Sequence, residues 1–179
     1  MFEGCKISFI GSGAMAEAMI SGLIRNKLAE PGLIFSSDPR QVRLDELVQR
    51  YHIHTSTSNV QVVTDADVVV LSIKPQVLQR VQGDIKEHIK PDALVLSIVA
   101  GSPVRKIADG LDHAIVVRSM PNTPAQIGQG ITVWTAAKVV SENQLNMARQ
   151  ILSALGDEIF LEDEYYLDMA TALSGTGPA

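Results

Sequence analysis

The sequence has little of three features, and each scarcity excludes a class of protein. Its 179 residues include a single cysteine, Cys5, which excludes an internal disulfide framework and a metal site built from several cysteines. No apolar run approaches the roughly 20 residues that a membrane-spanning helix needs. The 15 Lys and Arg residues are outnumbered by 20 Asp and Glu residues, which gives a formal net charge of −5. The sequence contains no cluster of basic residues of the kind that binds nucleic acid. The first residues lack the pattern of a signal peptide. We therefore expect a cytoplasmic globular protein that binds neither membranes nor nucleic acids.

Short apolar runs alternate along the chain with segments of helical periodicity. The runs are rich in Val and Ile and are bounded by Gly, Pro, Asp or Ser, which predicts strands buried in a parallel sheet. They cover residues 7–10, 33–35, 68–73, 93–98, 115–117 and 131–134. Helices are predicted at residues 14–25, 40–50 and 142–155, with Ser141 as the cap of the last. This alternation implies crossover connections, and it predicts an α/β fold with a parallel sheet.

The composition shifts near the end of the sequence. Glu162, Asp163 and Glu164 precede an apolar-periodic run. Acidic residues at the start of a helix interact favourably with its dipole. We therefore expect a new helix to begin near Asp163, and we divide the chain into a first domain over residues 1–162 and the start of a second over residues 163–179.

The strongest local signal is the sequence GSGAMA at residues 11–16, between the first predicted strand and the first predicted helix. In a dinucleotide-binding loop the first glycine, here Gly11, permits a tight turn. The second, Gly13, lets the backbone approach a pyrophosphate, and Ala16 fills the third position, which needs a small residue. The start of the helix offers free N–H groups to the phosphates. The alternative is a glycine-rich turn without a ligand, which the strand and helix on either side disfavour.

The end of the second predicted strand bears on the choice of cofactor. The hydroxyls of Ser36 and Ser37 and the guanidinium of Arg40 suit the 2′-phosphate of NADP(H). Asp38 would instead hold the ribose hydroxyls of NAD(H) if it turned inward. Its other interpretation is a turn residue before Pro39, and this is the one we favour. The sequence thus favours NADP(H), with NAD(H) as the alternative.

Other loops follow strands at the edge of the sheet where ligands bind in open α/β folds. Lys74, after residues 68–73, could contact the nicotinamide ribose, or it could be an ordinary exposed lysine. Ala100 and its neighbour Gly101 would let a nicotinamide or ribose lie against backbone. Asn122 and Thr123 lie between two prolines, where they either face a site or merely end a strand. Their common position at one edge favours a site.

Five segments occur in the order and spacing of one known family. They read GSGAMA at residues 11–16, IKPQ at 73–76, SIVAG at 97–101, RSMPNTP at 118–124 and ALSGTGPA at 172–179. Together they resemble pyrroline-5-carboxylate reductase over the full length of the chain. MPNTP and SGTGPA are specific to that family, whereas many dehydrogenases share the glycine loop. The resemblance implies a doubly wound, Rossmann-type, mostly parallel sheet and NAD(P)H as hydride donor. It also implies reduction of 1-pyrroline-5-carboxylate to L-proline, the last step of proline biosynthesis.

The motifs and the resemblance together define the candidate residues. The cofactor-binding set is Ile10, Gly11, Ser12, Gly13, Ala14, Met15, Ser36, Ser37, Arg40, Asn59, Ile73, Lys74, Pro75, Ala100 and Asn122. The substrate-proximal set is Thr123, Ser174, Gly175 and Thr176. Of these, Asn59 is interpreted from the sequence as a helix cap, and the resemblance adds an adenosine-ribose contact. No catalytic residue is identified, because an imine protonates easily and no His or carboxylate pair falls in these loops. No metal is expected, since His52 and His54 lack a third ligand.

The resemblance also exposes a departure. Family members continue past the SGTGPA segment with helices that carry a substrate loop and most of the subunit interface. We therefore expect this chain to hold the start of a helical dimerisation domain truncated at its carboxyl end. We expect it to be inactive alone, and the full-length protein to be a homo-oligomer with a small-molecule substrate. Two alternatives stay open: a related NADP-dependent reductase of another imine or of a deazaflavin, and a catalytically inactive nucleotide-binding relative.

Overall fold

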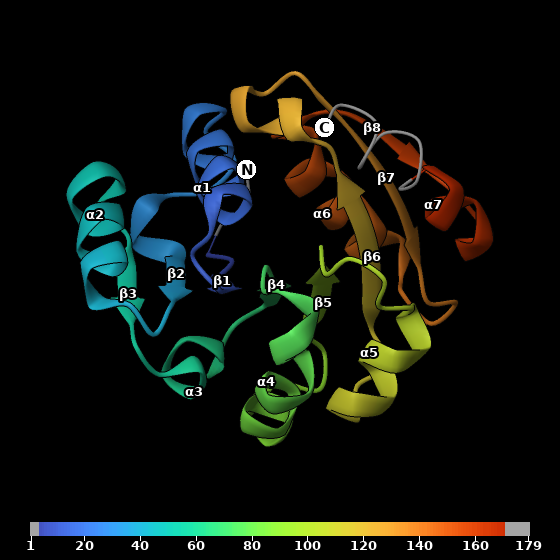
Figure 1. The fold of residues 1–179 in the computed structure, drawn as a ribbon, viewed down its shortest axis with the longest axis horizontal. Coiled ribbons are helices and arrows are strands. Elements are labelled where there is room, and N and C mark those ends of the chain that lie inside the picture. The colour runs from blue at the N-terminus through green and yellow to red at the C-terminus, as the bar shows by residue number, and fades with distance from the viewer. Residues whose placement is uncertain (1–3, 171–179) are drawn as a thin grey trace.

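The computed structural model describes residues 4–170, and a central eight-stranded sheet organises them (Figure 1). The strand order is β3-β2-β1-β4-β5-β6-β7-β8. The strands are β1 (Ile7–Ile10), β2 (Ile34–Ser37), β3 (His54–Ser56), β4 (Val68–Leu71), β5 (Leu94–Ser97), β6 (Val116–Pro121), β7 (Gly130–Ala136) and β8 (Gly156–Phe160). The strands from β1 to β6 are parallel in the doubly wound order, whereas β7 runs antiparallel to β6 and β8 parallel to β7. The predicted α/β class and mostly parallel sheet are confirmed.

Helices cover both faces of this sheet. The two faces carry two separate buried clusters, because successive residues of a strand point to opposite sides. In β4, for example, Val68 and Val70 join one cluster and Val69 and Leu71 the other. The first cluster lies under α1 (Ala14–Arg25), α2 (Gln41–Tyr51) and α6 (Glu142–Ser153). The second lies under α3 (Asn59–Val63), α4 (Leu78–Ile85) and α5 (Val104–Leu111), and Figure 1 shows α4 and α5 side by side.

Several elements have the predicted bounds. Strand β1 and helix α1 cover the expected residues, and Ser141 caps α6 as predicted. The Ser141 hydroxyl accepts a hydrogen bond from the Gln144 amide at 3.4 Å, and the Gln144 side chain accepts one from the Ser141 amide at 3.1 Å. This reciprocal capping box satisfies two amides that the first turn of a helix leaves without partners.

Other elements differ from the prediction for identifiable reasons. Strand β6 continues to Pro121, where the sequence predicted a loop, because β7 pairs with residues 117–121 and supplies their ladder. The edge strands β3 and β8 were not predicted, since they are short and largely polar or exposed. The predicted strand at residues 33–35 begins instead at Ile34, after a short 3₁₀ turn (Pro31–Leu33).

Helix α7 (Glu164–Ala170) begins one residue after the predicted start and is tied to the sheet through Glu164. The Glu164 carboxylate accepts hydrogen bonds from the guanidinium of Arg118 at 2.7 Å and from the amide of Val104 at 2.8 Å. Arg118 lies in β6 with 2% of its side chain exposed, and Val104 is the first residue of α5. Leu167 of the same helix is buried. One carboxylate thus joins α7 to both a strand and a helix.

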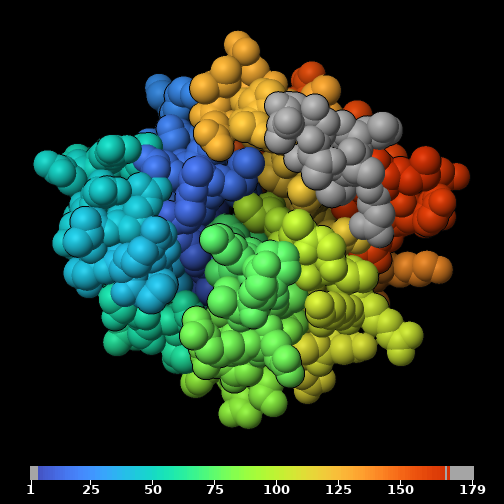
Figure 2. All heavy atoms as spheres, in the orientation of Figure 1, coloured from blue at the N-terminus to red at the C-terminus, as the bar shows by residue number. Residues whose placement is uncertain are grey.

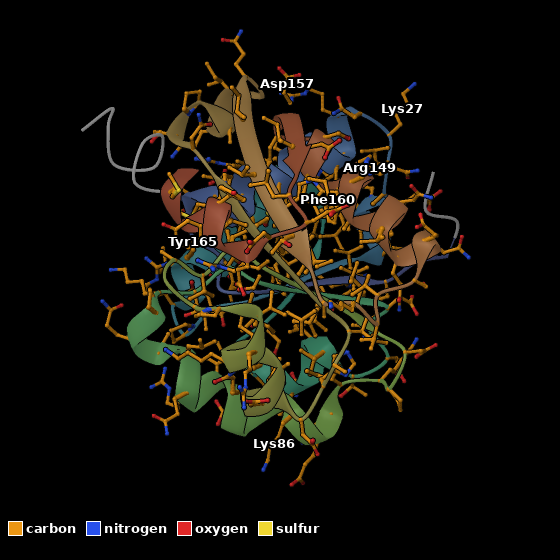
Figure 3. All side chains as sticks on the ribbon, turned by 90° about the vertical axis from the view of Figure 1, so that its right-hand side faces the viewer. Lys27, Lys86, Arg149, Asp157, Phe160 and Tyr165 are labelled. Carbon is orange, nitrogen blue, oxygen red and sulfur yellow. The ribbon has the colours of Figure 1, made fainter. Side chains whose placement is uncertain are left out.

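The outer edge of the sheet beside α7 exposes apolar side chains. Ile159 and Phe160 of β8 and Tyr165 and Tyr166 of α7 are all exposed. Figure 3 shows Phe160 and Tyr165 on the face turned toward the viewer. Trp134 lies fully buried behind this edge, with its indole N–H donated to Glu158 of β8.

Glycine at position 22 is required by close packing between α1 and the end of α6. A Cβ placed on Gly22 would lie 2.5 Å from the carbonyl oxygen of Ala154, whereas one on Gly83 of α4 would meet no atom within 4 Å. We expect Gly22→Ala to lower the free energy of unfolding by about 1–3 kcal/mol through overpacking. Gly83→Ala, the matched control, should raise it by about 0.5–1 kcal/mol through helix propensity. Urea denaturation of both variants measures the difference, and equal effects would contradict the packing argument.

The contact between Glu164 and Arg118 leads to a second prediction. Glu164→Ala leaves the buried Arg118 guanidinium without this carboxylate, so the free energy of unfolding should fall by about 2 kcal/mol, a value discounted for the partial exposure of Glu164. Amide hydrogen exchange should accelerate in α7 more than in β1 or β4. Glu162→Ala, at an exposed position just before the helix, is the control. If both variants unfold alike, the contact does not hold α7.

Candidate functional site

A cavity of about 280 Å³ opens at the carboxyl ends of β1, β2 and β4. This is where the strand order reverses direction, since β1 leads to β2 on one side and β4 lies on its other side. Figure 2 shows the blue amino-terminal segment meeting the green α4 region near the middle of the visible face. The lining residues are Ile10, Gly11, Ser12, Gly13, Ser37, Asp38, Pro39, Arg40, Asn59, Ser72, Ile73, Lys74, Val77, Arg80 and Val81.

The glycine loop forms the floor of this cavity, with the geometry that its sequence predicted. Gly11 has φ +93°, and a Cβ there would lie 2.6 Å from the carbonyl oxygen of Ser72, so only glycine fits. A Cβ on Gly13 would meet nothing within 4 Å, and Ala16 is fully buried. Among residues 4–170, the amides of Gly13, Ala14 and Met15 donate no hydrogen bond. These amides at the start of α1 are available to an anion.

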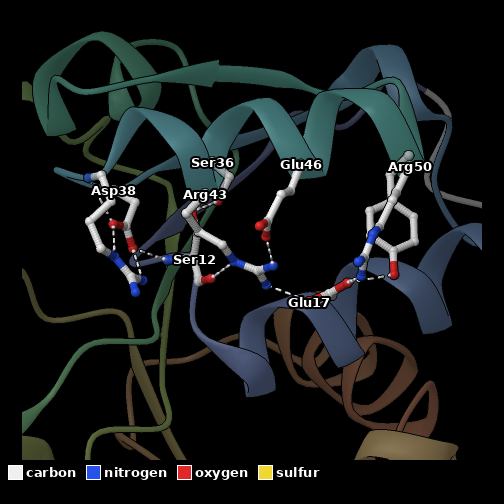
Figure 4. A network of polar contacts seen from close by, with 9 residues as sticks. Ser12, Glu17, Ser36, Asp38, Arg43, Glu46 and Arg50 are labelled. Carbon is white, nitrogen blue, oxygen red and sulfur yellow. Dashed lines mark hydrogen bonds and ion pairs between the residues drawn. The ribbon is translucent and has the colours of Figure 1, made fainter.

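Ser12 anchors the loop through every polar group it has (Figure 4). Its amide donates to Asp38 at 3.2 Å, and its carbonyl accepts from Nε of Arg43 at 2.7 Å. Its hydroxyl contacts the Ser36 hydroxyl at 2.8 Å and donates to the Ser37 carbonyl at 3.2 Å. Ser12 and Ser36 are both fully buried, so the Ser36 hydroxyl supports the loop from below and does not line the cavity.

The Asp38 carboxylate lines the cavity, and its oxygens already accept hydrogen bonds from the protein itself. Its carboxylate accepts from Nε of Arg40 at 2.8 Å and from the Arg40 amide at 3.0 Å, besides the Ser12 amide. Burial acts to raise the pKa of Asp38, but the hydrogen bonds from Arg40 and Ser12 outweigh it and hold the pKa below its usual value. The carboxylate is therefore ionised at neutral pH and committed to the turn. Arg40, with 66% of its side chain exposed, lies at the wall of the cavity.

Asn59 lies in the cavity wall, although the sequence suggested a helix cap. The cap of α3 is Ser58, whose hydroxyl accepts the Gln61 amide at 3.4 Å. Asn59 is the first residue of the helix, and its side-chain oxygen accepts the Ser37 hydroxyl at 2.8 Å. The capping interpretation was wrong by one residue because serine and asparagine cap equally well.

The opposite wall comes from the segment that follows β4 and from α4, and it includes residues that no sequence motif marked. The candidate residues Ile73 and Lys74 line this wall, and so do Ser72, Val77, Arg80 and Val81. Val77, directly before α4, and Val81 within it are four residues apart, and this spacing could have identified the helix face that turns inward. Arg40, Lys74 and Arg80 give the cavity three cations against one carboxylate. The cavity thus has an excess of positive charge and suits an anionic ligand.

The other candidate residues lie outside this cavity. Ala14, Met15, Ser36, Pro75, Ala100, Asn122 and Thr123 are not among its lining residues. Ala100 follows β5 at the same edge of the sheet. The Asn122 side chain accepts the Ile131 amide at 2.9 Å and so tightens the turn between β6 and β7. Ser174, Gly175 and Thr176 lie outside the described residues.

Cys5, His52 and His54 do not line the cavity. Burial raises the pKa of the Cys5 thiol to about 11, with a further contribution from Asp67, so the thiol is protonated at neutral pH. His52 ends α2 and does not share a strand with His54, and in the described part of the chain no group of three His, Cys, Asp or Glu is placed to hold a metal. Within residues 4–170, no helix has the length and apolar character that crossing a membrane requires.

Comparison with solved structures places this fold beside two reductases. A pyrroline-5-carboxylate reductase from Coxiella burnetii superposes with a TM-score of 0.93 at 35% identity, covering 97% of this chain and 65% of that one. A pyrroline carboxylate reductase from Plasmodium falciparum with NADP bound has a TM-score of 0.86 at 24% identity, over 99% of this chain and 65% of that one. At that identity the second match shows the fold alone.

Sequence comparison points the same way. The pyrroline-5-carboxylate reductase of Pseudomonas aeruginosa is 41% identical over 175 residues, which are 97% of this chain and 64% of that protein. Pyrroline-5-carboxylate reductase 1 of Bacillus subtilis is 35% identical over 181 residues, covering 100% of this chain and 61% of that protein. The chain thus spans less than two thirds of the length of these relatives. The family described as NADP oxidoreductase coenzyme F420-dependent matches residues 6–101, more than half of the sequence. The chain belongs to this NADP oxidoreductase family.

Proposed function

We propose that this chain is the cofactor-binding part of a pyrroline-5-carboxylate reductase. The enzyme would reduce 1-pyrroline-5-carboxylate to L-proline with NAD(P)H. The observation that carries the proposal is the cavity at the strand-order reversal, where an excess of cations lies beside Gly13, whose amide donates no hydrogen bond within residues 4–170. Similarity to enzymes of this name over nearly the whole chain supports it.

The candidate residues divide among the parts of a dinucleotide. The amides of Gly13, Ala14 and Met15 would hold the pyrophosphate, and Ser37, Arg40 and Asn59 would lie at the adenosine ribose. Lys74 and Ala100 would lie toward the nicotinamide ribose. When bound, a reduced nicotinamide supplies the hydride for the C=N bond, and the protein contributes binding and orientation. Thr123, Ser174, Gly175 and Thr176 stay candidates for the substrate side.

We infer a preference for NADP(H) from the hydrogen bonds that the Asp38 carboxylate already makes. A carboxylate that selects NAD(H) must be free to accept the ribose hydroxyls. Here Arg40 and the Ser12 amide already occupy the Asp38 oxygens, and the exposed guanidinium of Arg40 is available to a 2′-phosphate. We propose a cytoplasmic enzyme with a small-molecule substrate: the single cysteine fits a reducing compartment, and the acidic net charge does not favour a nucleic-acid partner.

We also propose that residues 1–162 form the nucleotide-binding domain and residues 163–179 the start of a helical one. Helix α7 begins next to that boundary and is anchored to β6 and α5 through Glu164. The exposed apolar side chains of β8 and α7 support a contact surface there for further helices or a second subunit of a full-length homo-oligomer.

The activity is tested with the complete gene product. We expect NADPH-dependent reduction of 1-pyrroline-5-carboxylate, followed at the nicotinamide absorbance, and negligible turnover by residues 1–179 alone because most of the substrate site would be missing. Turnover only with another imine or with a deazaflavin would replace the proposal with a related reductase. Binding of NADPH without turnover of any of these would indicate an inactive relative.

The cofactor preference is tested with residues 1–179 by fluorescence titration. The unmodified chain should bind NADPH more tightly than NADH. Arg40→Gln should weaken NADPH binding about tenfold, because a charge-assisted bond to the 2′-phosphate is lost. It should not weaken NADH binding, because the Asp38 oxygens that the Arg40 guanidinium occupied become free for the ribose hydroxyls. Arg105→Gln, at a 92% exposed position on α5, is the control. Equal weakening of both nucleotides by Arg40→Gln would refute the assigned role.

A further inference from the structure

Arg43 of α2 reaches across to the glycine loop, although it does not line the cavity (Figure 4). Its Nε donates to the carbonyl of Ser12 at 2.7 Å. Only 16% of its side chain is exposed, so water screens this contact little. Neither the glycine motif nor the spacing of the strand-end loops points to this residue, because it lies in the next helix along the chain.

Two carboxylates orient the Arg43 guanidinium. One terminal nitrogen is paired with Glu17 of α1, and the other with Glu46 of α2 at 2.9 Å. Glu17 is held in turn by Arg50 at 3.0 Å and by the hydroxyl of Tyr51 at 3.0 Å. Burial acts to raise the pKa of Glu17, but its bonds to Arg43, Tyr51 and Arg50 outweigh this and lower it, so Glu17 stays ionised at neutral pH. With both terminal nitrogens engaged, Nε is directed at the loop.

Fixing the Ser12 carbonyl also fixes the next amide. The described residues contain no cis peptide bond, so the Ser12–Gly13 peptide is trans and planar. Its N–H, which belongs to Gly13, therefore points away from the side on which Arg43 holds the carbonyl. Gly13 lines the cavity and its amide has no partner within residues 4–170. Glycine tolerates a wider range of φ than other residues, so without a tether this peptide could rotate about the N–Cα bond of Gly13.

We propose that Arg43 is a positioning residue for dinucleotide binding: it holds the Ser12–Gly13 peptide so that the Gly13 amide is directed toward the pyrophosphate of the ligand. The inference rests on the proposed nucleotide-binding function. It assigns to α2 a part in forming the anion site, in addition to the part of β2 in contacting the adenosine ribose. A donor that is already oriented needs no ordering when the ligand binds, and this lowers the cost of binding.

Arg50 offers a matched control on the same helix. Arg43→Gln and Arg50→Gln remove the same charge and each removes one partner of Glu17, but only Arg43 contacts Ser12. Binding to residues 1–179 is measured for NADPH directly, and for ADP and adenosine 2′-phosphate by displacement of NADPH. ADP contains the pyrophosphate, whereas adenosine 2′-phosphate lacks it and would contact only the adenosine end of the cavity.

Arg43→Gln should weaken NADPH and ADP about tenfold or more, and adenosine 2′-phosphate less than twofold. Arg50→Gln should change all three less than about threefold, because Arg50 is 59% exposed and its charge is screened. Equal effects of the two variants, or equal weakening of all three ligands by Arg43→Gln, would overturn the inference. A merely structural role for Arg43 would not separate ligands by their pyrophosphate.

A second variant and a measurement without nucleotide test the role of Arg43 even if Arg43→Gln does not fold. If Arg43→Gln does not fold, as thermal unfolding would show, Arg43→Lys keeps the charge but cannot make all three contacts, and it should show the same ligand pattern more weakly. In the free protein, the NMR order parameter of the Gly13 amide should fall in the Arg43 variant and not in Arg50→Gln. This measurement uses no nucleotide. Failure of the unmodified chain to bind NADPH would therefore refute the proposed function, while an unchanged order parameter would refute the role of Arg43.

Discussion

The site depends on how one short loop is held where the first strand turns into the first helix. Ser12 makes four hydrogen bonds, which connect the loop to β2, to the turn after it and to α2. Gly11 lies so close to the Ser72 carbonyl that a side chain would not fit. With Ser12 committed to the protein, the next amides along the chain have no partner within residues 4–170 and stand at the positive end of the α1 dipole. Because the polar groups of Ser12 bind within the protein, the amides that follow it remain available to a ligand.

Charge around this loop is arranged in two zones. Beside the cavity, Asp38 is compensated by Arg40, and Lys74 and Arg80 add positive charge from the opposite wall. Behind the loop, Glu17 and Glu46 are balanced by Arg43 and Arg50. The carboxylates nearest the loop are therefore paired with cations, which reduces their repulsion of an anionic ligand. At the other end of the same sheet edge, Glu164 and the buried Arg118 connect α7 to β6.

A feature of the structure was predictable from the sequence when the interactions that form it join residues close together in the chain. Strand β1, helix α1 and the cap at Ser141 were predictable, since each depends on residues only a few positions apart. The cap at Asn59 was misplaced by one residue because its neighbour Ser58 has the same capping ability. The extension of β6 could not be predicted, since it depends on pairing with β7. Arg80 was missed because the spacing of its apolar neighbours Val77 and Val81 marks a helix face but does not show that this face lies beside a loop formed some 70 positions earlier.

The sequence by itself determined the α/β class, the glycine loop with its strand and helix, and most of the strand-end segments. These follow from hydrophobic periodicity and from the φ angles that glycine alone tolerates, which are properties of short stretches of chain. Only the tertiary structure decided that Asp38 is committed to Arg40 and that Arg80 completes the cavity wall. Only the tertiary structure, too, brings Arg43 to the Ser12 carbonyl. The physical reason is that a charged side chain on a helix or turn acquires its role from the group it faces, and the packing of α2 and α4 against the sheet chooses that group.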